Sequence, residues 1–178
     1  MNEESRQSTV DSRQGRPLGP LVRRARVEDG PRIVGLDREL ARFEKLRPPD
    51  DEEAARLLSW IFESKRLEAL VAEVDGRVEG MALFYEGLGT FRAKPFLYLE
   101  DLVVSEAARS RGVGEALMAA LAREAVTRGA LRIEWAVLDW NGRAITFYDR
   151  LGAHRPHEWI KYALEGDQLA KVARQSQP

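Results

Sequence analysis

The sequence predicts a mixed α/β domain, and three observations support this prediction. The spacing of apolar residues switches repeatedly between about two residues, typical of strands, and about 3.6 residues, typical of helices. The chain has 178 residues, a length typical of one domain, and 44% of them are hydrophobic, which is enough to build one core. It contains no cysteine, which excludes disulfide frameworks, cysteine-bound zinc and a thiolate nucleophile.

Local signals place the boundaries of the elements. Pro48 and Pro49 end a first helix, and Asp50 or Asp51 can cap a second one. The dipeptide Asp75-Gly76 is typical of a two-residue hairpin turn. The predicted elements are, in order, a strand over 21–26, helices over 29–46 and 51–64, strands over 70–74 and 78–85, a loop over 87–94, a strand over 96–104, a helix over 112–127, a strand over 131–138, a helix over 141–151 and a strand over 158–164.

The helices and strands form one domain, expected over residues 21–166. Residues 1–20 hold hardly any apolar side chain and predict a disordered tail, and residues 167–178 are expected to form a C-terminal tail. In the last predicted helix, Asn141 is placed as the N-cap and Gly152 as the left-handed terminator.

Charge and hydropathy limit the partners. The 28 Lys and Arg residues against 29 Asp and Glu residues give a net charge of −1, so nucleic acid and anionic lipid are not expected partners. No segment is apolar for the roughly 18 residues of a membrane span, and no secretory signal is recognisable. We therefore expect a cytoplasmic protein without a membrane partner.

The segment Arg109-Ser110-Arg111-Gly112-Val113-Gly114 lies between a predicted strand and a predicted helix. Free amides at a helix N-terminus, with glycines that allow close approach, favour phosphate binding. The segment lacks the third glycine of a dinucleotide fingerprint and the Gly-Lys-Ser/Thr of a Walker loop. An ordinary glycine-rich turn explains the hexapeptide equally well.

Further segments in the same order carry a family resemblance. Tyr98-Leu99-Glu100-Asp101 precedes this hexapeptide, and Asp139-Trp140-Asn141 and Phe147-Tyr148 with Leu151-Gly152-Ala153 follow it. Together they resemble the Gcn5-related N-acetyltransferase (GNAT) superfamily, and within it the diamine (spermidine/spermine-type) acetyltransferase group. The resemblance spans residues 21–164 and implies a mixed sheet that splays open after the Glu100 strand to admit acetyl-CoA as co-substrate.

The resemblance also implies the residues that bind this co-substrate. In an opened sheet, the free backbone groups of Leu102 and Val104 can pair with the amide-rich pantetheine arm. The pyrophosphate would be held by Arg109 and by the loop from Arg111 through Gly112 and Val113 to Gly114. The residues expected near the pantetheine and thioester end are Asn141, Arg143 and Ala144. No metal is expected, because proline separates His154 from His157 and no third ligand is evident.

The reaction needs a base and an acid. An otherwise apolar strand would desolvate Glu100 and make it a better base, so we expect it to accept the proton of the attacking amine. The resemblance implies that Tyr148 protonates the departing sulfur. From the strand and helix context alone, Glu100 is also interpretable as a structural carboxylate paired with an arginine, Tyr148 as a core aromatic and Asn141 as a helix cap.

The acceptor is expected to be the primary amine of a small molecule. Glu44, Asp101 and Glu134 could form an acidic lining, with the ring of Phe43 beside it, although Glu44 is equally interpretable as a solvated helix charge. Polyamine enzymes have an acidic residue and a tryptophan before Tyr-Leu-Glu-Asp, where this chain has Thr90 and Arg92. Arg92 would repel a long polyamine, which leaves short amines, thialysine-like amino acids and other small amines that carry a carboxylate.

Two further expectations concern function and assembly. A non-catalytic module that senses acyl-CoA is the alternative to an enzyme, and it would need neither Glu100 nor Tyr148. The polyamine-type relatives are homodimers, and the predicted last strand, with Trp159, Ile160 and Tyr162, could pair between two chains. The same three residues could instead pack in the core of a monomer.

Overall fold

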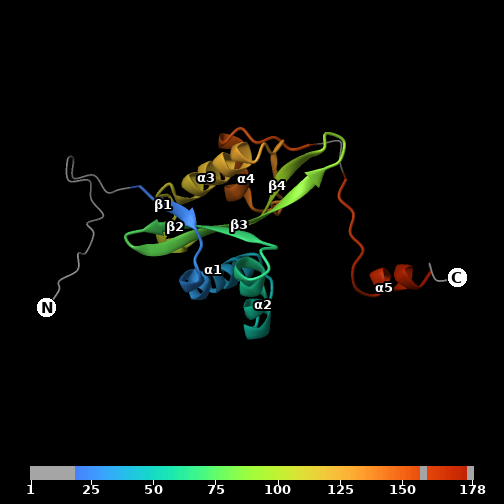
Figure 1. The fold of residues 1–178 in the computed structure, drawn as a ribbon. Helices are drawn as coiled ribbons and strands as arrows, with labels where there is room; N and C mark the ends of the chain where they lie inside the picture. The colour runs from blue at the N-terminus through green and yellow to red at the C-terminus, as the bar shows by residue number, and fades with distance from the viewer. Residues whose placement is uncertain (1–18, 157–159, 176–178) are drawn as a thin grey trace. The chain divides into compact units, whose positions relative to one another are not determined.

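A computed structural model describes residues 19–156 and 160–175, which fall into two compact units that divide between Ala136 and Val137. The first unit is built on a five-stranded sheet in the order β1-β2-β3-β4-β5 (Figure 1). All neighbouring strands are antiparallel except β4 and β5, which are parallel. The strands are β1 (Leu21–Arg24), β2 (Glu68–Val74), β3 (Arg77–Gly89), β4 (Lys94–Val104) and β5 (Ile133–Glu134). The mixed α/β prediction is confirmed.

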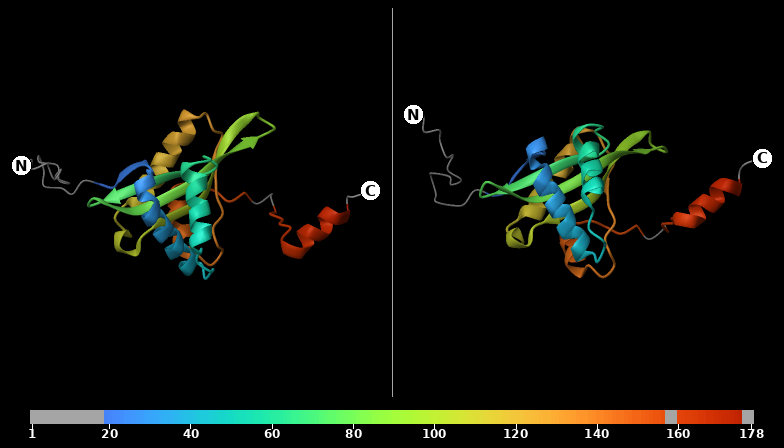
Figure 2. Two further views of the ribbon diagram at one scale, coloured as in Figure 1. Left: turned by 60° about the horizontal axis from the view of Figure 1, so that its bottom comes forward. Right: turned by 90° about the horizontal axis from the view of Figure 1, so that it is seen from below.

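Helices cover both faces of this sheet (Figures 1 and 2). One face carries α1 (Gly30–Phe43), which follows a 3₁₀ turn (Val27–Asp29), and α2 (Asp51–Phe62). The other carries α3 (Val113–Thr127), which follows a second 3₁₀ turn (Glu106–Ala108). The core under α1 and α2 consists of buried residues from the helices, the sheet and the segment before β2: Ile33, Leu36, Ile61, Leu67, Ala69, Val71, Met81, Leu83 and Val103. On the α3 side, Gly80 permits close packing, since a Cβ atom there would lie 2.7 Å from Cγ1 of Val113.

The β2–β3 hairpin has the predicted turn, with positive φ angles of 52° at Asp75 and 75° at Gly76. The β3–β4 hairpin is longer than predicted, so the expected loop over 87–94 is wrong. Cross-strand pairing continues to Gly89 and Lys94, and only residues 90–93 form the turn. Gly87, which suggested a loop, instead makes room for the ring of Phe96, because a Cβ atom would lie 2.3 Å from its Cζ.

A β-bulge interrupts β4 at its centre. Leu83 pairs with Asp101 and Phe84 pairs with Leu99, so Glu100 is an additional residue on β4. The parallel pairing of β4 with β5 covers only two residue pairs and ends at Tyr98, before the bulge. The expected strand over 131–138 is therefore reduced to two residues, Ile133 and Glu134, because no further pairs with β4 form.

The second unit contains α4 (Gly142–Arg150) and α5 (Gly166–Gln175). The Ala144 amide donates to Oδ1 of Asn141 at 3.1 Å, and Gly152 has a φ of +81°, so both predicted ends of α4 are confirmed. The helix α5 lies in the segment expected to be a tail. None of the helices in the two described ranges is long and apolar enough to cross a membrane.

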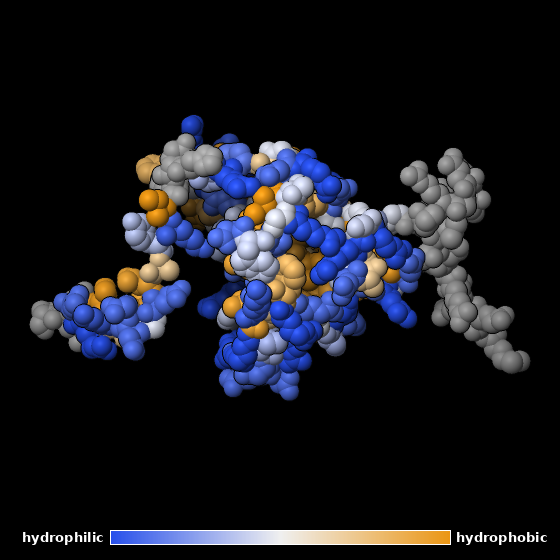
Figure 3. Space-filling model, turned by 180° about the vertical axis from the view of Figure 1, so that it is seen from behind, coloured by the Kyte–Doolittle hydropathy of each residue, from blue (hydrophilic) through white to orange (hydrophobic). Residues whose placement is uncertain are grey.

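The predicted last strand is not found in its described part. Residues 160–164 have no strand structure, and 157–159, including Trp159, lie outside the described residues. The alternating apolar pattern needs a paired backbone to become a strand, and Ile160 and Tyr162 are instead 77% and 88% exposed. Figure 3 shows hydrophobic side chains at the surface of α5 as well, where Leu169 is 54% exposed.

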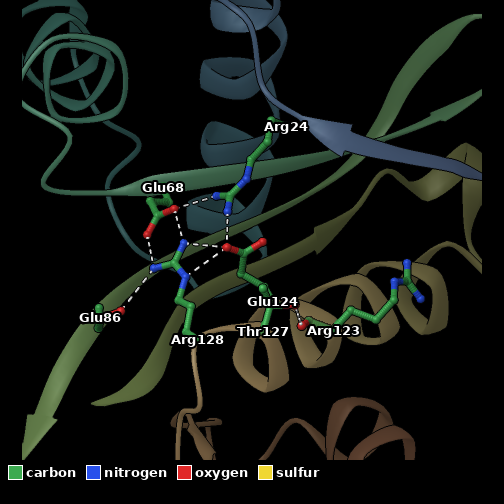
Figure 4. A network of polar contacts seen from close by, with 7 residues as sticks. All are labelled: Arg24, Glu68, Glu86, Arg123, Glu124, Thr127 and Arg128. Atoms are coloured by element: carbon green, nitrogen blue, oxygen red, sulfur yellow. Dashed lines mark hydrogen bonds and ion pairs between the residues drawn. The ribbon is translucent and has the colours of Figure 1, made fainter. Parts of the chain in front are cut away.

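An arginine–glutamate network joins the sheet to the end of α3 (Figure 4). The Arg128 guanidinium donates to Glu68 at 2.6 and 2.7 Å and to Glu124 at 2.7 and 2.9 Å. Arg24 contacts the same two carboxylates. Both guanidinium groups lie over the ring of fully buried Phe84, at 5.4 and 5.8 Å from its centroid. Burial acts to raise the pKa of Glu68, but bonds and charges from Arg128 and Arg24 lower it overall.

We predict that Arg128→Met destabilises the protein by about 1 to 3 kcal/mol at pH 7, because it leaves two half-buried carboxylates with one arginine. Urea unfolding monitored by circular dichroism measures the effect. Arg123→Met on the same helix is the matched control, since the Arg123 side chain takes no part in the network. Equal stability of the two variants would contradict this role of Arg128.

Candidate active site

The edge of β4 beyond the bulge has free backbone groups. The Ser105 amide donates to the Glu79 carbonyl of β3 at 2.8 Å. Because backbone groups alternate between the two sides of a strand, those of Leu102 and Val104 face away from β3. Within the described residues, no strand pairs with β4 on that side beyond Tyr98. Leu102 and Val104 thus lie where the sequence predicted an open edge.

The loop before α3 presents amides at the start of this helix. Ser110 and Gly112 have φ angles of 63° and 77°, and Gly112 is the N-cap. The first intrahelical bond runs from the Ala116 amide to the Gly112 carbonyl at 3.0 Å. The amides of Val113 and Gly114 belong to the turn that has no intrahelical acceptor, and such a turn is a ready site for an anion.

Two arginines flank this loop, and both are exposed. Arg111 donates to Asp75 at 2.8 Å, and Arg109 is the C-cap of the second 3₁₀ turn. A surface pocket of about 370 Å³ adjoins the Arg111–Asp75 pair. An exposed ion pair of this kind contributes at most about 1 kcal/mol, so a phosphate can compete with Asp75 for Arg111. The helix tip and the open edge together fit a ligand that carries a pyrophosphate and several amides, as acetyl-CoA does.

The two carboxylates at the bulge have different surroundings. Glu100 is exposed, so the desolvation expected there from the apolar strand is wrong. Desolvation acts on the next residue, Asp101, which is partly buried. Burial, followed by the charges of Asp37, Glu100 and Glu44, raises the pKa of Asp101 from 3.8 to about 7.

Two of these charges belong to Asp37 in α1 and to Glu44 at its C-cap, and α1 packs against β4. Asp37 and Glu44 are seven residues apart, which places them on the same side of the helix. Burial raises the pKa of both, and at Asp37 the charge of Arg38 opposes this effect. Glu44 was predicted to line the acceptor site and is partly buried, not fully solvated.

Asp37 is the functional candidate that the sequence reasoning missed. It follows Ile33 by four residues and precedes Leu40 by three, so it falls on the apolar side of the helix. An acidic residue at such a position is the signal that could have identified it.

Aromatic side chains lie beside the carboxylates. Tyr85 and Tyr98 stack with their ring centroids 5.3 Å apart. Burial, and then the charges of Glu100 and Tyr98, raise the pKa of Tyr85, so its phenol lies in the field of the Glu100 carboxylate. Phe43, at the end of α1, is 44% exposed.

Glu134 differs from the other predicted lining residues. Its carboxylate is ion-paired with Arg132, so its charge is already compensated. The Arg132 guanidinium also lies over the ring of Phe96, 4.7 Å from the centroid.

The remaining predicted residues belong to the second unit. Burial raises the pKa of Tyr148 to about 12, so its phenol stays protonated at neutral pH. In the first turn of α4, Arg143 is exposed and Ala144 is partly buried. Within the ranges 19–156 and 160–175, no group of three His, Asp or Glu side chains is arranged to hold a metal ion.

The raised pKa of Asp101 predicts a dependence of stability on pH. Because its pKa is higher in the folded protein, the folded state binds more protons than the unfolded state between about pH 4 and 7, and stability falls as pH rises through this window. Asp101→Asn removes the ionisable group and therefore this fall in stability with rising pH. At pH 8 we expect its melting temperature to exceed that of the wild type by about 2–4 °C, the effect of about 1 kcal/mol in a domain of this size.

Melting curves at pH 5 and pH 8 measure this difference. At pH 5 the wild-type Asp101 is already neutral in the folded protein, so the two proteins should melt much closer together. A variant that is less stable than the wild type at pH 8 would contradict the assignment of an unfavourable charge to Asp101.

Known proteins are similar to this chain in both sequence and fold. The family model of the acetyltransferase (GNAT) family matches residues 32–153. Thialysine N-epsilon-acetyltransferase of Caenorhabditis elegans is 32% identical over 144 residues, which cover 79% of this chain and 89% of that protein. L-ornithine N5-acetyltransferase of Arabidopsis thaliana is 41% identical over 95 residues, 53% of this chain, and the match spans 42% of that protein.

Among solved structures, an integron cassette protein from the mobile metagenome of V. cholerae has a TM-score of 0.77 at 28% identity, with 88% of this chain and 98% of that chain covered. The resemblance found in the Tyr98–Asp101 run and in the glycine-rich loop is thereby confirmed. The chain belongs to the acetyltransferase (GNAT) family.

Proposed function

We propose that this protein transfers the acetyl group of acetyl-CoA to a primary amine of a small molecule, by direct attack with both substrates bound. The observation that carries the proposal is the position of the acidic cluster of Asp37, Glu44, Glu100 and Asp101. On β4, Glu100 and Asp101 immediately precede the open edge at Leu102. A site that attracts cations thus adjoins a site that suits the acyl donor.

The residues that would hold acetyl-CoA follow from the free backbone groups. Leu102 and Val104 would pair with the pantetheine amides, and the amides of Val113 and Gly114 would hold the pyrophosphate. Arg109 and Arg111 would add charge to the phosphate site, and Asn141, Arg143 and Ala144 would lie near the thioester end. When bound, acetyl-CoA supplies an activated acetyl thioester.

The chain's own residues would manage the protons. Glu100 and Asp101 are adjacent, so either carboxylate could take up a proton from the acceptor's ammonium group. A carboxyl group with a pKa of about 7 is half ionised at neutral pH and is a stronger base than an ordinary aspartate. The Tyr148 phenol holds the proton that the departing sulfur needs. The chain has no cysteine to carry a covalent acetyl group.

The names of the relatives and the charge of Arg92 indicate which classes of acceptor to test. The relatives named above act on thialysine and ornithine, and both are small amino acids with a side-chain amine. Arg92 is exposed in the β3–β4 turn, where its charge would disfavour a long polyamine. Short diamines and diamino acids are therefore the proposed acceptors. A sensor without turnover is not favoured, since these relatives are named as acetyltransferases.

The roles of Glu100 and Tyr148 predict kinetic effects. Glu100→Gln and Tyr148→Phe should each lower kcat by about 10²-fold or more, the usual contribution of a general base or acid. Release of free coenzyme A thiol with a panel of small amines measures the rates. Matched controls are Glu106→Gln and Tyr162→Phe, at exposed positions outside the site, and they should retain wild-type rates. An unchanged kcat in both active-site variants would refute the assignment.

We also propose a cytoplasmic homodimer whose catalytic domain spans residues 21–166. The second unit supports dimerisation, because it exposes apolar side chains that a monomer would leave in water: Ile160, Tyr162, Leu164, Leu169 and Val172.

Light scattering at micromolar concentration should give twice the mass of the 20.1 kDa chain. The double variant Ile160→Asp, Tyr162→Ser should shift this mass toward the monomer, because it removes apolar area from the contact. A monomer mass for the wild-type protein would refute the proposal.

A further inference from the structure

Most carboxylates that are shielded from water in the described part of the first unit have an arginine partner. Among residues 19–136, eleven acidic residues are buried or partly buried, and eight of these form ion pairs with arginine. The eight are Asp29, Glu39, Glu53, Glu68, Glu73, Glu79, Glu124 and Glu134. The other three are Asp37, Glu44 and Asp101, and the charges of Asp37 and Glu44 act on the Asp101 carboxyl.

The closest cation in the sequence does not satisfy Asp37. Arg38 follows it directly, but its guanidinium donates to the Pro49 carbonyl at 3.1 Å and to Asp51 at 2.7 Å. The charge of Arg38 therefore only opposes, and does not cancel, the effect of burial on the Asp37 carboxyl. Because a half-buried carboxylate without a cation costs stability, three of them across one helix–strand contact indicate that a positive ligand belongs there.

The reacting amine alone does not account for this much negative charge. An ammonium group must lose its proton before it can attack, and the nitrogen is neutral when it does so. A neutral nitrogen gains little from Asp37 and Glu44 in addition to the bulge carboxylates. The excess of anions matches an acceptor with a second ammonium group that stays protonated throughout the reaction.

We propose that Asp37 is a specificity-determining residue of this acceptor site: across the contact of α1 with β4, it binds the second ammonium group of an acceptor that carries two. This inference rests on the proposed function and assigns the recognition of that charge to α1. It separates the two tasks of the acidic cluster, since Glu100 and Asp101 take up the proton and Asp37 selects the substrate.

The test compares an α,ω-diamine with the monoamine of the same carbon chain length, at saturating acetyl-CoA. Asp37→Asn is expected to lower kcat/KM for the diamine by about tenfold, mainly through KM, and to change that for the monoamine by less than about twofold. Asp37→Glu should restore most of the preference for the diamine. Calorimetric titration of the diamine in the presence of coenzyme A should show a Kd about tenfold weaker for Asp37→Asn.

Controls separate the possible causes of failure. Glu63→Gln removes one negative charge at the exposed end of α2 and should leave both substrates unaffected. Asparagine is nearly isosteric with aspartate and removes an unpaired charge, so Asp37→Asn should melt no lower than the wild type. Asp37→Ser provides a second substitution that removes the same charge. Equal losses for diamine and monoamine, or no loss for either, would overturn the role of Asp37. A wild-type protein that acetylates no amine would overturn the proposed function and this inference with it.

Discussion

The one-residue bulge at Glu100 is the constraint on which the rest of the candidate site depends. Before it, β4 has neighbours on both sides, and after it, among the described residues, β4 is paired only with β3. The bulge places Glu100 between Leu99, which pairs with Phe84, and Asp101, which pairs with Leu83. With the bulge, Glu100 is exposed, Asp101 lies in the field of the α1 carboxylates, and Leu102 presents its backbone at an open edge. The groups proposed for proton transfer, acceptor binding and donor binding thus lie on three consecutive residues.

The carboxylates of the first unit fall into two groups, those that are paired with arginine and those that are not. Around Phe84, Arg24 and Arg128 compensate Glu68 and Glu124, and this network ties α3 to the sheet (Figure 4). Between α1 and β4 no arginine performs this task for Asp37, Glu44 or Asp101 among the described residues. The first arrangement stabilises the scaffold, whereas the second places uncompensated charge where a cationic substrate can supply the missing partner.

Local signals in the sequence correctly predicted helix caps and the β2–β3 hairpin turn, which depend only on residues close by in the chain. Asn141 caps its helix and Asp75-Gly76 turns its hairpin because capping and turn geometry are decided within a few residues. Contacts between distant segments escaped prediction. The length of β5 depends on the course of β4, the apolar alternation at 160–164 lacks a strand partner, and Gly87 is determined by the Phe96 ring across the hairpin.

The candidate site shows the same division. The glycine-rich loop and the Glu100-Asp101 pair were recognisable as motifs, but which of the two carboxylates loses water depends on a bulge that the sequence does not reveal. Asp37 was missed because its partial burial near Asp101 arises only when α1 packs against β4. Burial and charge pairing are properties of the folded chain, so the motif predicts where the chemistry lies and the structure shows how its charges are distributed.

Amide hydrogen exchange along β4, measured with and without saturating coenzyme A, tests the central claim most directly. If the ligand pairs with the open edge beyond the bulge, exchange should slow at Leu102 and Val104 and at the amides of Val113 and Gly114, while the hairpin end of β4 near Lys94 stays unchanged. Unaltered exchange at Leu102 and Val104 in the coenzyme A complex would contradict the account, because the opened sheet would then have no role in binding the donor.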